Sequence, residues 1–452
     1  MALPEGWRDD LEPWIADEID IIVKAFAECD EDSRVDIGFV REGRGLDYMF
    51  AEGQLLVREP YLDQVLGILG LGNEREFRAD RTDRIRRVIA GVVLITTGPA
   101  TDTEQFYVPD VLARIDEELG AGIATPNHAL TVSGDAGTCP ATEPEEVYSK
   151  IEPYPSVCHD GGGHGVLIYL ADTGLLPDPG LGHPWLAGVR MGDPAEDEDT
   201  GGSQTPIPPY TAHGTFTAGV TRCMAPAADI VVTNAFKVAG STLESDLVPR
   251  LVRALGHGVD IFHLTVAAPS RADLPLISFE AWLRLLRQYK GTVCLAAAGN
   301  SDTRRPHWPG AFHDVLSVGA LAADWRSKAS FSNYGGWVDV YAPGRDLINA
   351  YATGTYECKV DPYNGQPRTF YGMAKWSGTS FSTPIVTGLI ASRMSRTGEN
   401  AEQAAAAVLA EAQAQAIPGV GAVLLPDCPG ERRRGAAGCC CAAHQHGHCG
   451  CH

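Results

Sequence analysis

The chain of 452 residues has no apolar run that approaches the ~20 residues needed to cross a bilayer, which argues against a transmembrane helix. Its first ten residues have neither the basic start nor the apolar stretch of a signal peptide. We therefore expect a cytoplasmic protein that does not bind membranes, and secretion stays open as the alternative.

Basic residues are scarce beside acidic ones, with 36 Lys and Arg against 58 Asp and Glu and a net charge of −22. An acidic surface repels nucleic acid and anionic membranes, so neither is expected as a partner. Hydrophobic residues make up 44% and charged residues 21% of the chain, which is typical of a globular protein rather than a disordered one. The length allows a large core and more than one domain.

The cysteines show no regular framework spacing. Six are scattered, namely Cys29, Cys139, Cys158, Cys223, Cys294 and Cys358. In a reducing compartment these would be free thiols. The other six crowd the C-terminus among histidines, where residues of both types can bind zinc or copper.

The C-terminal tail, residues 427–452, offers a set of candidate metal ligands. They are Cys439, Cys440, Cys441, His444, His446, His448, Cys449 and Cys451. Their spacing matches no closed zinc finger. We favour the simpler interpretation, a disordered tail whose affinity for metal is incidental.

The stretch 376–384, Trp-Ser-Gly-Thr-Ser-Phe-Ser-Thr-Pro, carries the first candidate for chemistry. It precedes an apolar segment, 385–391, with helical spacing. A serine at a helix start faces unpaired N–H groups and the positive end of the helix dipole, which favour a developing anion. Ser380 is therefore a candidate nucleophile, and Gly378 would allow the entry turn. An ordinary helix cap is the alternative.

A serine hydroxyl needs a base, and the base needs a group that orients it. Asp172 follows a predicted buried strand, 165–171, and His213 lies among small residues at a predicted helix start. Asn300 ends an apolar strand, 292–298, where its amide could donate to an oxyanion. Each alone has an ordinary alternative: a turn, a structural histidine or a loop. Their joint occurrence favours a catalytic site.

These segments resemble the motifs of the subtilisin-like serine proteases, the subtilase family, over roughly residues 150–425. The matching stretches are Asp172-Thr173-Gly174, His213-Gly214-Thr215, Ala298-Gly299-Asn300 and Gly378-Thr379-Ser380-Phe381-Ser382-Thr383-Pro384, in the family's order Asp, His, Ser. The resemblance implies a serine endopeptidase that acts through an acyl-enzyme. It gives Asp172, His213 and Ser380 the roles of a catalytic triad and Asn300 a place in the oxyanion hole.

The resemblance also implies where a protein or peptide substrate would lie. An extended segment would add as a strand beside Leu264, Thr265, Val266 and Ala267, and Ala296, Ala297 and Ala298 would flank the first pocket. Many relatives carry Ser-Leu-Gly where this chain has Thr265-Val266-Ala267, and the added methyl groups would narrow the groove. The alternative function is a catalytically dead, subtilase-fold protein that binds or regulates.

Residues 1–132 are predicted to form a small α+β domain. The predicted elements are a helix within 1–30, strands at 35–40, 54–57, 88–96 and 125–132, and helices at 60–69 and 109–119. Their order resembles a subtilase propeptide, whose last strand enters the substrate cleft and inhibits it. On this interpretation the chain is an autoinhibited zymogen. An unrelated N-terminal domain or interaction module is the alternative.

Residues 133–162 are rich in Gly, Pro, Thr and Glu, which predicts a linker and a processing region. In 163–426 strands and helices alternate, which predicts an α/β fold, a subtilisin-like parallel sheet with helices on both faces. The predicted strands are 229–236, 260–266, 314–320 and 337–341, and the predicted helices are 243–255, 279–289 and 401–414. The acidic run 193–199 is a candidate structural calcium loop, with a solvated loop as the alternative. No cofactor is expected for catalysis.

Overall fold

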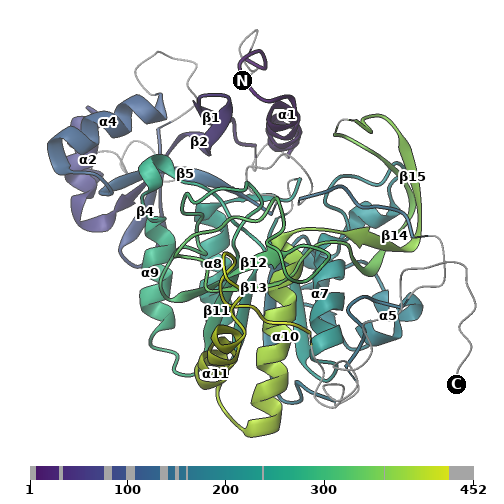
Figure 1. Ribbon diagram of the computed structural model, residues 1–452. Helices are drawn as coiled ribbons and strands as arrows, with labels where there is room; N and C mark the ends of the chain where they lie inside the picture. The colour runs from purple at the N-terminus through teal and green to yellow at the C-terminus, as the bar shows by residue number, and fades with distance from the viewer. Residues whose placement is uncertain are drawn as a thin grey trace, which may run out of the picture.

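The computed structural model describes residues 7–29, 34–75, 84–97, 107–132, 141–147, 152–158, 161–236, 239–360 and 362–426. These residues form a parallel sheet flanked by helices and a second, antiparallel sheet built mainly from the N-terminal part of the chain. Figure 1 shows the N-terminal elements, in purple and blue, against one side of the parallel-sheet region.

The parallel sheet has the strand order β13-β12-β11-β10-β6-β8-β7. Its strands are β6 (Leu167–Asp172), β7 (Arg190–Met191), β8 (Asp229–Asn234), β10 (Ile261–Leu264), β11 (Val293–Ala297), β12 (Val315–Leu321) and β13 (Val340–Pro343). The central strands are apolar and almost entirely buried, as strands covered on both faces must be. The predicted α/β fold with a parallel sheet is confirmed.

Neighbouring residues on β10 show that helices cover both faces of this sheet. His263 bonds Thr387 of α10 (Thr379–Thr397), whereas the ring of Phe262 contacts Trp282 of α9 (Ile277–Leu286). Successive side chains of a strand point to opposite faces, so α10 and α9 lie on opposite sides.

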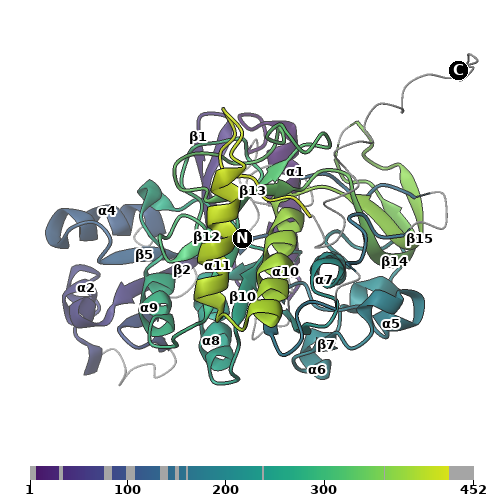
Figure 2. The ribbon, with the colours of Figure 1, turned by 60° about the horizontal axis from the view of Figure 1, so that its bottom comes forward.

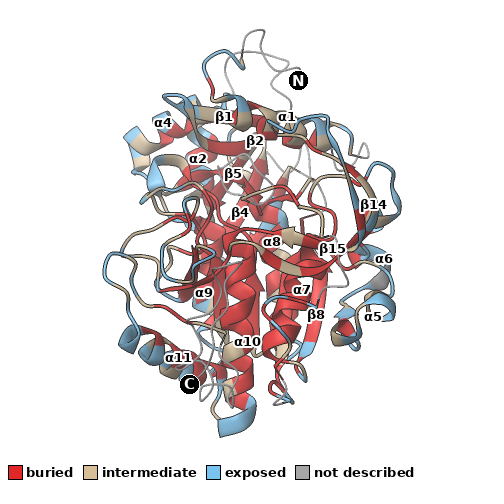
Figure 3. Ribbon diagram, turned by 45° about the vertical axis from the view of Figure 1, so that its right-hand side comes forward, coloured by how far each residue is buried: buried red, intermediate tan, exposed pale blue. Residues whose placement is uncertain are grey.

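The other long helices of this region are α7 (His213–Met224), α8 (Glu244–Leu255) and α11 (Ala401–Ala414). Figure 2 shows α10 and α11 side by side, and α10 also contacts α7. Both α7 and α10 are buried along most of their length, as Figure 3 shows, so they are core helices.

The antiparallel sheet has the order β3-β4-β2-β5-β9, with β1 paired to β2. Its strands are β1 (Ile37–Glu42), β2 (Gly45–Arg58), β3 (Ile85–Ile89), β4 (Val92–Thr96), β5 (Ala124–Thr131) and β9 (Ser241–Leu243). Two helices, α2 (Leu62–Ile68) and α4 (Val108–Leu119), share an apolar core with this sheet. Because β9 comes from the segment before α8, the last N-terminal strand, β5, pairs directly with the larger unit.

Two parts of the fold differ from the sequence prediction. Residues 88–96 do not form one strand, because the chain turns at Gly91 (φ 88°) and β3 pairs back onto β4. The hairpin of β14 (Leu347–Glu357) and β15 (Pro367–Trp376) was not predicted. The helix predicted within residues 1–30 is confirmed as α1 (Pro13–Ala27).

The remaining elements are short. They are η1 (Glu59–Tyr61), α5 (Pro179–Gly182), η4 (Pro184–Leu186), α6 (Pro194–Asp197), η5 (Thr200–Ser203) and η6 (Arg271–Asp273). None of the helices in the described ranges is long and apolar enough to cross a membrane.

The cysteines agree only in part with the expectation of free thiols. Cys223, Cys294 and Cys358 are free thiols, but Cys158 is disulfide-bonded, so the expectation is wrong for that residue. Cys139 and the whole tail 427–452, with every candidate metal ligand in it, lie outside the described residues.

Candidate active site

Two motif residues, Asp172 at the end of β6 and His213 at the start of α7, form a buried pair. Neither is accessible to solvent, and His213 Nδ1 lies 2.7 Å from Asp172 Oδ1. The N–H of Thr173 also donates to that oxygen at 2.7 Å. Burial raises the pKa of Asp172, but the charge of His213 and the two hydrogen bonds lower it by more, so the net shift is downward. Asp172 is therefore a carboxylate at neutral pH, and it holds the proton of His213 on Nδ1.

The other ring nitrogen of His213 is left as a base. Nε2 is buried and has no hydrogen-bond partner among the residues that the structure describes. The ring centroid lies 5.0 Å from that of Phe381 and 5.6 Å from that of Trp376. These apolar contacts fix the ring while leaving Nε2 able to accept a proton.

Ser380, the second residue of α10, is fully buried. Its Oγ donates to the carbonyl oxygen of Val132 at 3.2 Å, and the carbonyl oxygen of Thr265 lies 3.5 Å away. The hydroxyl is thus bound by the residue that directly follows β5. The N-terminal part of the chain reaches the predicted nucleophile.

Asn300 is oriented by Thr379, the neighbour of Ser380. Asn300 Oδ1 accepts hydrogen bonds from both the N–H and the Oγ1 of Thr379, each at 2.9 Å. Thr379 Oγ1 in turn accepts from the N–H of Gly299 at 3.1 Å. These bonds fix which end of the amide faces Thr379, so Nδ2 is the end that can donate elsewhere. The sequence prediction missed Thr379, although its hydroxyl lies within the serine motif.

The predicted substrate groove is occupied by the chain itself. Strand β5 pairs antiparallel with β9, with Thr131 opposite Ser241. The N–H of Val132 donates to the carbonyl oxygen of Gly240 at 3.0 Å, and the N–H of Ala267 donates to that of Thr131 at 3.3 Å. The end of β5 therefore lies between β9 and the segment that contains Ala267.

The other predicted groove residues are all buried. Leu264, Thr265 and Val266 lie at or just beyond the end of β10, and Ala296, Ala297 and Ala298 at or just beyond the end of β11. Their roles in binding substrate stay a prediction.

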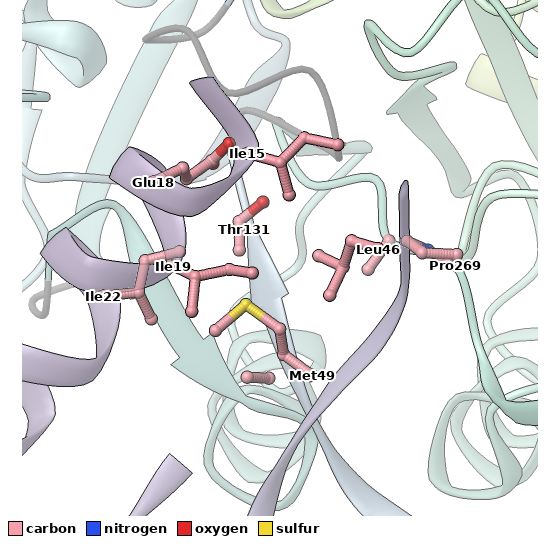
Figure 4. A pocket seen from close by; sticks show the side chains of 10 residues that line it. Ile15, Glu18, Ile19, Ile22, Leu46, Met49, Thr131 and Pro269 are labelled. Atoms are coloured by element: carbon pink, nitrogen blue, oxygen red, sulfur yellow. The ribbon is translucent and has the colours of Figure 1, made fainter. Parts of the chain in front are cut away.

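Helix α1 packs over the outer side of β5. Its apolar residues Ile15 and Ile19 share a cluster with Ala129 of β5 and Leu243 of β9. Figure 4 shows the small cavity enclosed here, with Glu18 of α1 beside Thr131. Tyr210 Oη donates to Glu18 Oε1 at 3.4 Å, which ties the helix to the segment before His213.

Several ion pairs join the N-terminal part to the larger unit. Among them are Arg58–Glu280 at 2.6 Å, Arg86–Asp246 at 2.9 Å, Asp116–Arg271 at 2.7 Å and Asp47–Arg305 at 2.6 Å. Asn127 of β5 adds a reciprocal pair of bonds to Ser245 at the start of α8: its Nδ2 donates to Ser245 Oγ at 3.0 Å, and its Oδ1 accepts from Ser245 N at 3.1 Å. Asn127 of β5 thus binds the N-terminus of α8.

The acidic run 193–199 is organised by backbone bonds. Asp197 accepts from the N–H groups of Asp193 and Asn234, and Asp199 from those of Gly201 and Ala212. No group of three or more His, Cys, Asp or Glu side chains arranged to hold a metal ion occurs within the described ranges. The structure therefore adds no support to the predicted calcium loop.

Known proteins resemble this chain in sequence and fold. The model of the subtilase family matches residues 163–422. The intracellular serine protease of Paenibacillus polymyxa is 28% identical over 249 residues, which are 52% of this chain and 69% of that protein. Thermitase of Thermoactinomyces vulgaris is 28% identical over 272 residues, 57% of this chain and 84% of its own. Fervidolysin from Fervidobacterium pennivorans, a keratinolytic enzyme related to subtilisin, shows the fold with a TM-score of 0.53 at 16% identity, over 84% of this chain and 61% of its own.

A parallel sheet with a buried Asp–His pair at one strand end and a serine at a helix start defines a subtilisin-like protein. The family match covers more than half of the 452 residues, so the chain belongs to the subtilase family of serine proteases. The family predicted from the four motifs is confirmed.

Proposed function

We propose that this protein is a serine endopeptidase that hydrolyses peptide bonds through an acyl-enzyme, with Asp172, His213 and Ser380 as the catalytic triad. The observation that carries the proposal is the buried pair of His213 Nδ1 and Asp172 Oδ1, 2.7 Å apart. This pair leaves the unpartnered Nε2 of His213 as the base that Ser380 requires.

In the proposed reaction, Ser380 Oγ attacks the scissile carbonyl carbon while His213 Nε2 takes the hydroxyl proton. The same nitrogen then gives that proton to the leaving amine, and a water molecule repeats the sequence to release the acid. Asp172 stabilises the imidazolium through its bond to Nδ1. The Nδ2 of Asn300 and the backbone N–H of Ser380 donate to the oxyanion.

The N-terminal segment acts as an intramolecular inhibitor in this proposal. The end of β5 lies where an extended substrate would add as a strand. The carbonyl oxygen of Val132 accepts the hydrogen bond of the Ser380 hydroxyl. On this basis we assign residues 1–132 to a propeptide-like domain, 133–162 to a linker with the processing site, and 163–426 to the catalytic domain. The ion pairs to the larger unit and the packing of α1 hold the inhibitor in place.

The test of the proposed function is covalent labelling of Ser380 by a serine-directed phosphonylating probe. After hours at neutral pH, we expect the wild-type chain to gain the mass of one phosphonyl group on the peptide that contains Ser380. Ser380→Ala should gain none. A wild-type chain that stays unlabelled even after its N-terminal segment has been removed would show that the site binds without catalysing.

Inhibition by β5 predicts that a charge placed on this strand will open the cleft. Leu130 is fully buried within the main core cluster, so the carboxylate of an Asp at this position would be removed from water among apolar side chains. We expect Leu130→Asp to speed phosphonylation of Ser380 at least about tenfold, because burying an unpaired carboxylate is strongly unfavourable. The labelling rate of the freshly purified chain measures this.

The matched control is Leu181→Asp, since Leu181 is 88% exposed. It should leave the labelling rate unchanged. Equal rates for Leu130→Asp and the wild type would rule out β5 as the inhibitory element, while labelling itself would still support the catalytic assignment.

A further inference from the structure

Asp199, in the acidic run between the aspartate and histidine motifs, is 7% exposed and points at the backbone that leads into His213. Its Oδ2 accepts the N–H of Ala212 at 2.5 Å, and its Oδ1 accepts the N–H of Gly201 at 3.1 Å. Ala212 is the residue directly before His213. One carboxylate therefore ties two separate backbone segments together next to the proposed base.

The backbone that Asp199 holds has an unfavourable conformation. Ala212 has φ 64° and ψ 7°, and Tyr210 has φ 67°, in the left-handed region that residues with a Cβ seldom adopt. No side chain caps α7 at Ala212. The hydrogen bond that the Ala212 N–H donates to the buried carboxylate of Asp199 holds the backbone in this conformation.

The packing around Gly201 shows that the fit is close. A Cβ on Gly201 would lie 2.2 Å from Thr211 Oγ1 and 3.1 Å from Asp199 Oδ1. The start of η5 is thus pressed against residues 211–212. Asp199 has little room to move away from the Ala212 N–H.

Asp199 also acts through its charge. Burial raises its pKa to about 6, against the hydrogen bonds from Ala212 and Gly201, and the charge of Asp172 adds to the rise while that of His213 opposes it. Two of the other acidic groups in the run have little effect on the pKa of Asp199. The carboxylate of Asp197 is bound by backbone amides, and Glu198 is exposed to solvent. Above about pH 6 a second negative charge therefore faces the Asp172–His213 pair.

We propose that Asp199 is a positioning residue for the reaction: it fixes the backbone before His213, and its charge stabilises the imidazolium that forms when His213 accepts the proton of Ser380. The inference rests on the proposed function of this site. The sequence motifs do not indicate this role, because Asp199 lies outside all four of them.

The test compares Asp199→Asn with Asp197→Asn. Asp197 is also buried, at 3% exposure, and also accepts two backbone N–H groups, but neither of these belongs to the segment that leads into His213. We expect Asp199→Asn to lower kcat about tenfold with little change in KM, as for the loss of one charge-assisted hydrogen bond. Asp197→Asn should lower thermal stability but leave kcat unchanged.

The pH profile separates positioning from a purely structural role. In the wild type, Asp199 takes up a proton as the pH falls through about 6, so the part of kcat that depends on its charge should be lost in this step. In Asp199→Asn the amide cannot titrate, so this step should be absent from the pH profile. A stability effect alone would not remove the step.

Two results would overturn the inference: a kcat for Asp199→Asn equal to that of Asp197→Asn, or a pH profile of Asp199→Asn that has the same shape as that of the wild type. If Asp199→Asn folds poorly, both readouts are taken with Ala212→Gly added, because glycine adopts φ 64° without strain, and Ala212→Gly alone is the reference. A wild type no more active than Ser380→Ala would instead refute the proposed function, and the inference with it.

Discussion

Ser380→Ala is expected to lower kcat for peptide hydrolysis about a million-fold, as removal of a serine-protease nucleophile does when base and orienting group remain. The hydroxyl of Ser380 is the group that forms the acyl-enzyme, and no other side chain in the described site is placed to replace it. The N-terminal segment should also stay attached. Intact mass over hours at neutral pH should show the wild type losing a fragment that ends between about residues 125 and 162, and the variant remaining whole.

Ser382→Ala is the matched control for this experiment. Ser382 is also fully buried in the first turn of α10, but its hydroxyl donates to the carbonyl oxygen of Thr379 at 3.0 Å rather than facing the cleft. It should keep near wild-type activity. Hydrolysis by Ser380→Ala at more than about a hundredth of the wild-type rate would contradict the assignment of the nucleophile.

Much of the fold could be predicted because the parallel strands carry unbroken apolar runs. Residues 165–171 and 292–298 have few polar side chains, and each strand leads directly into a motif, so both the sheet and the edge that bears the site could be predicted from the sequence. The long helices α8, α9 and α11 were predicted within a few residues for the same reason, since their apolar positions follow the helical repeat.

Two elements of the fold were predicted wrongly or missed because their sequences lack a clear pattern. Residues 88–96 alternate too little to reveal the turn at Gly91, and a single glycine is a weak turn signal. The hairpin β14–β15 mixes exposed and buried positions without a regular period. Both are local ambiguities that only the pairing of the strands resolves.

The site shows a different limit. The four motif residues were found because their residue types are tied to chemistry. Thr379 acts through a hydrogen bond to Asn300, 79 residues away in the chain. Asp199 acts through a hydrogen bond from Ala212, 13 residues away. Such non-local bonds leave no pattern in a single sequence. The sequence of the run 193–199 therefore suggested only a calcium loop or a solvated loop, whereas two of its carboxylates, Asp197 and Asp199, are buried acceptors of backbone N–H groups.

Asn300→Ala is expected to lower kcat by about 10²–10³ with little change in KM, because the loss of one oxyanion donor is felt mainly in the transition state. The bonds from Thr379 hold Oδ1 away from the reacting carbonyl, so Nδ2 is the group that alanine removes from the site. Steady-state kinetics on the processed enzyme, normalised by active-site titration, measure the effect.

The control for this substitution is Asn349→Ala. Asn349 is fully buried as well, and its Oδ1 accepts a hydrogen bond from Trp185 Nε1 at 3.0 Å. Among the described residues, it forms no hydrogen bond with Ser380 or Thr379. It should lower stability and leave kcat intact. If Asn300→Ala raised KM while kcat held, the amide would bind ground-state substrate instead of the oxyanion, and stabilisation of the tetrahedral intermediate would fall to the backbone N–H of Ser380 and the dipole of α10.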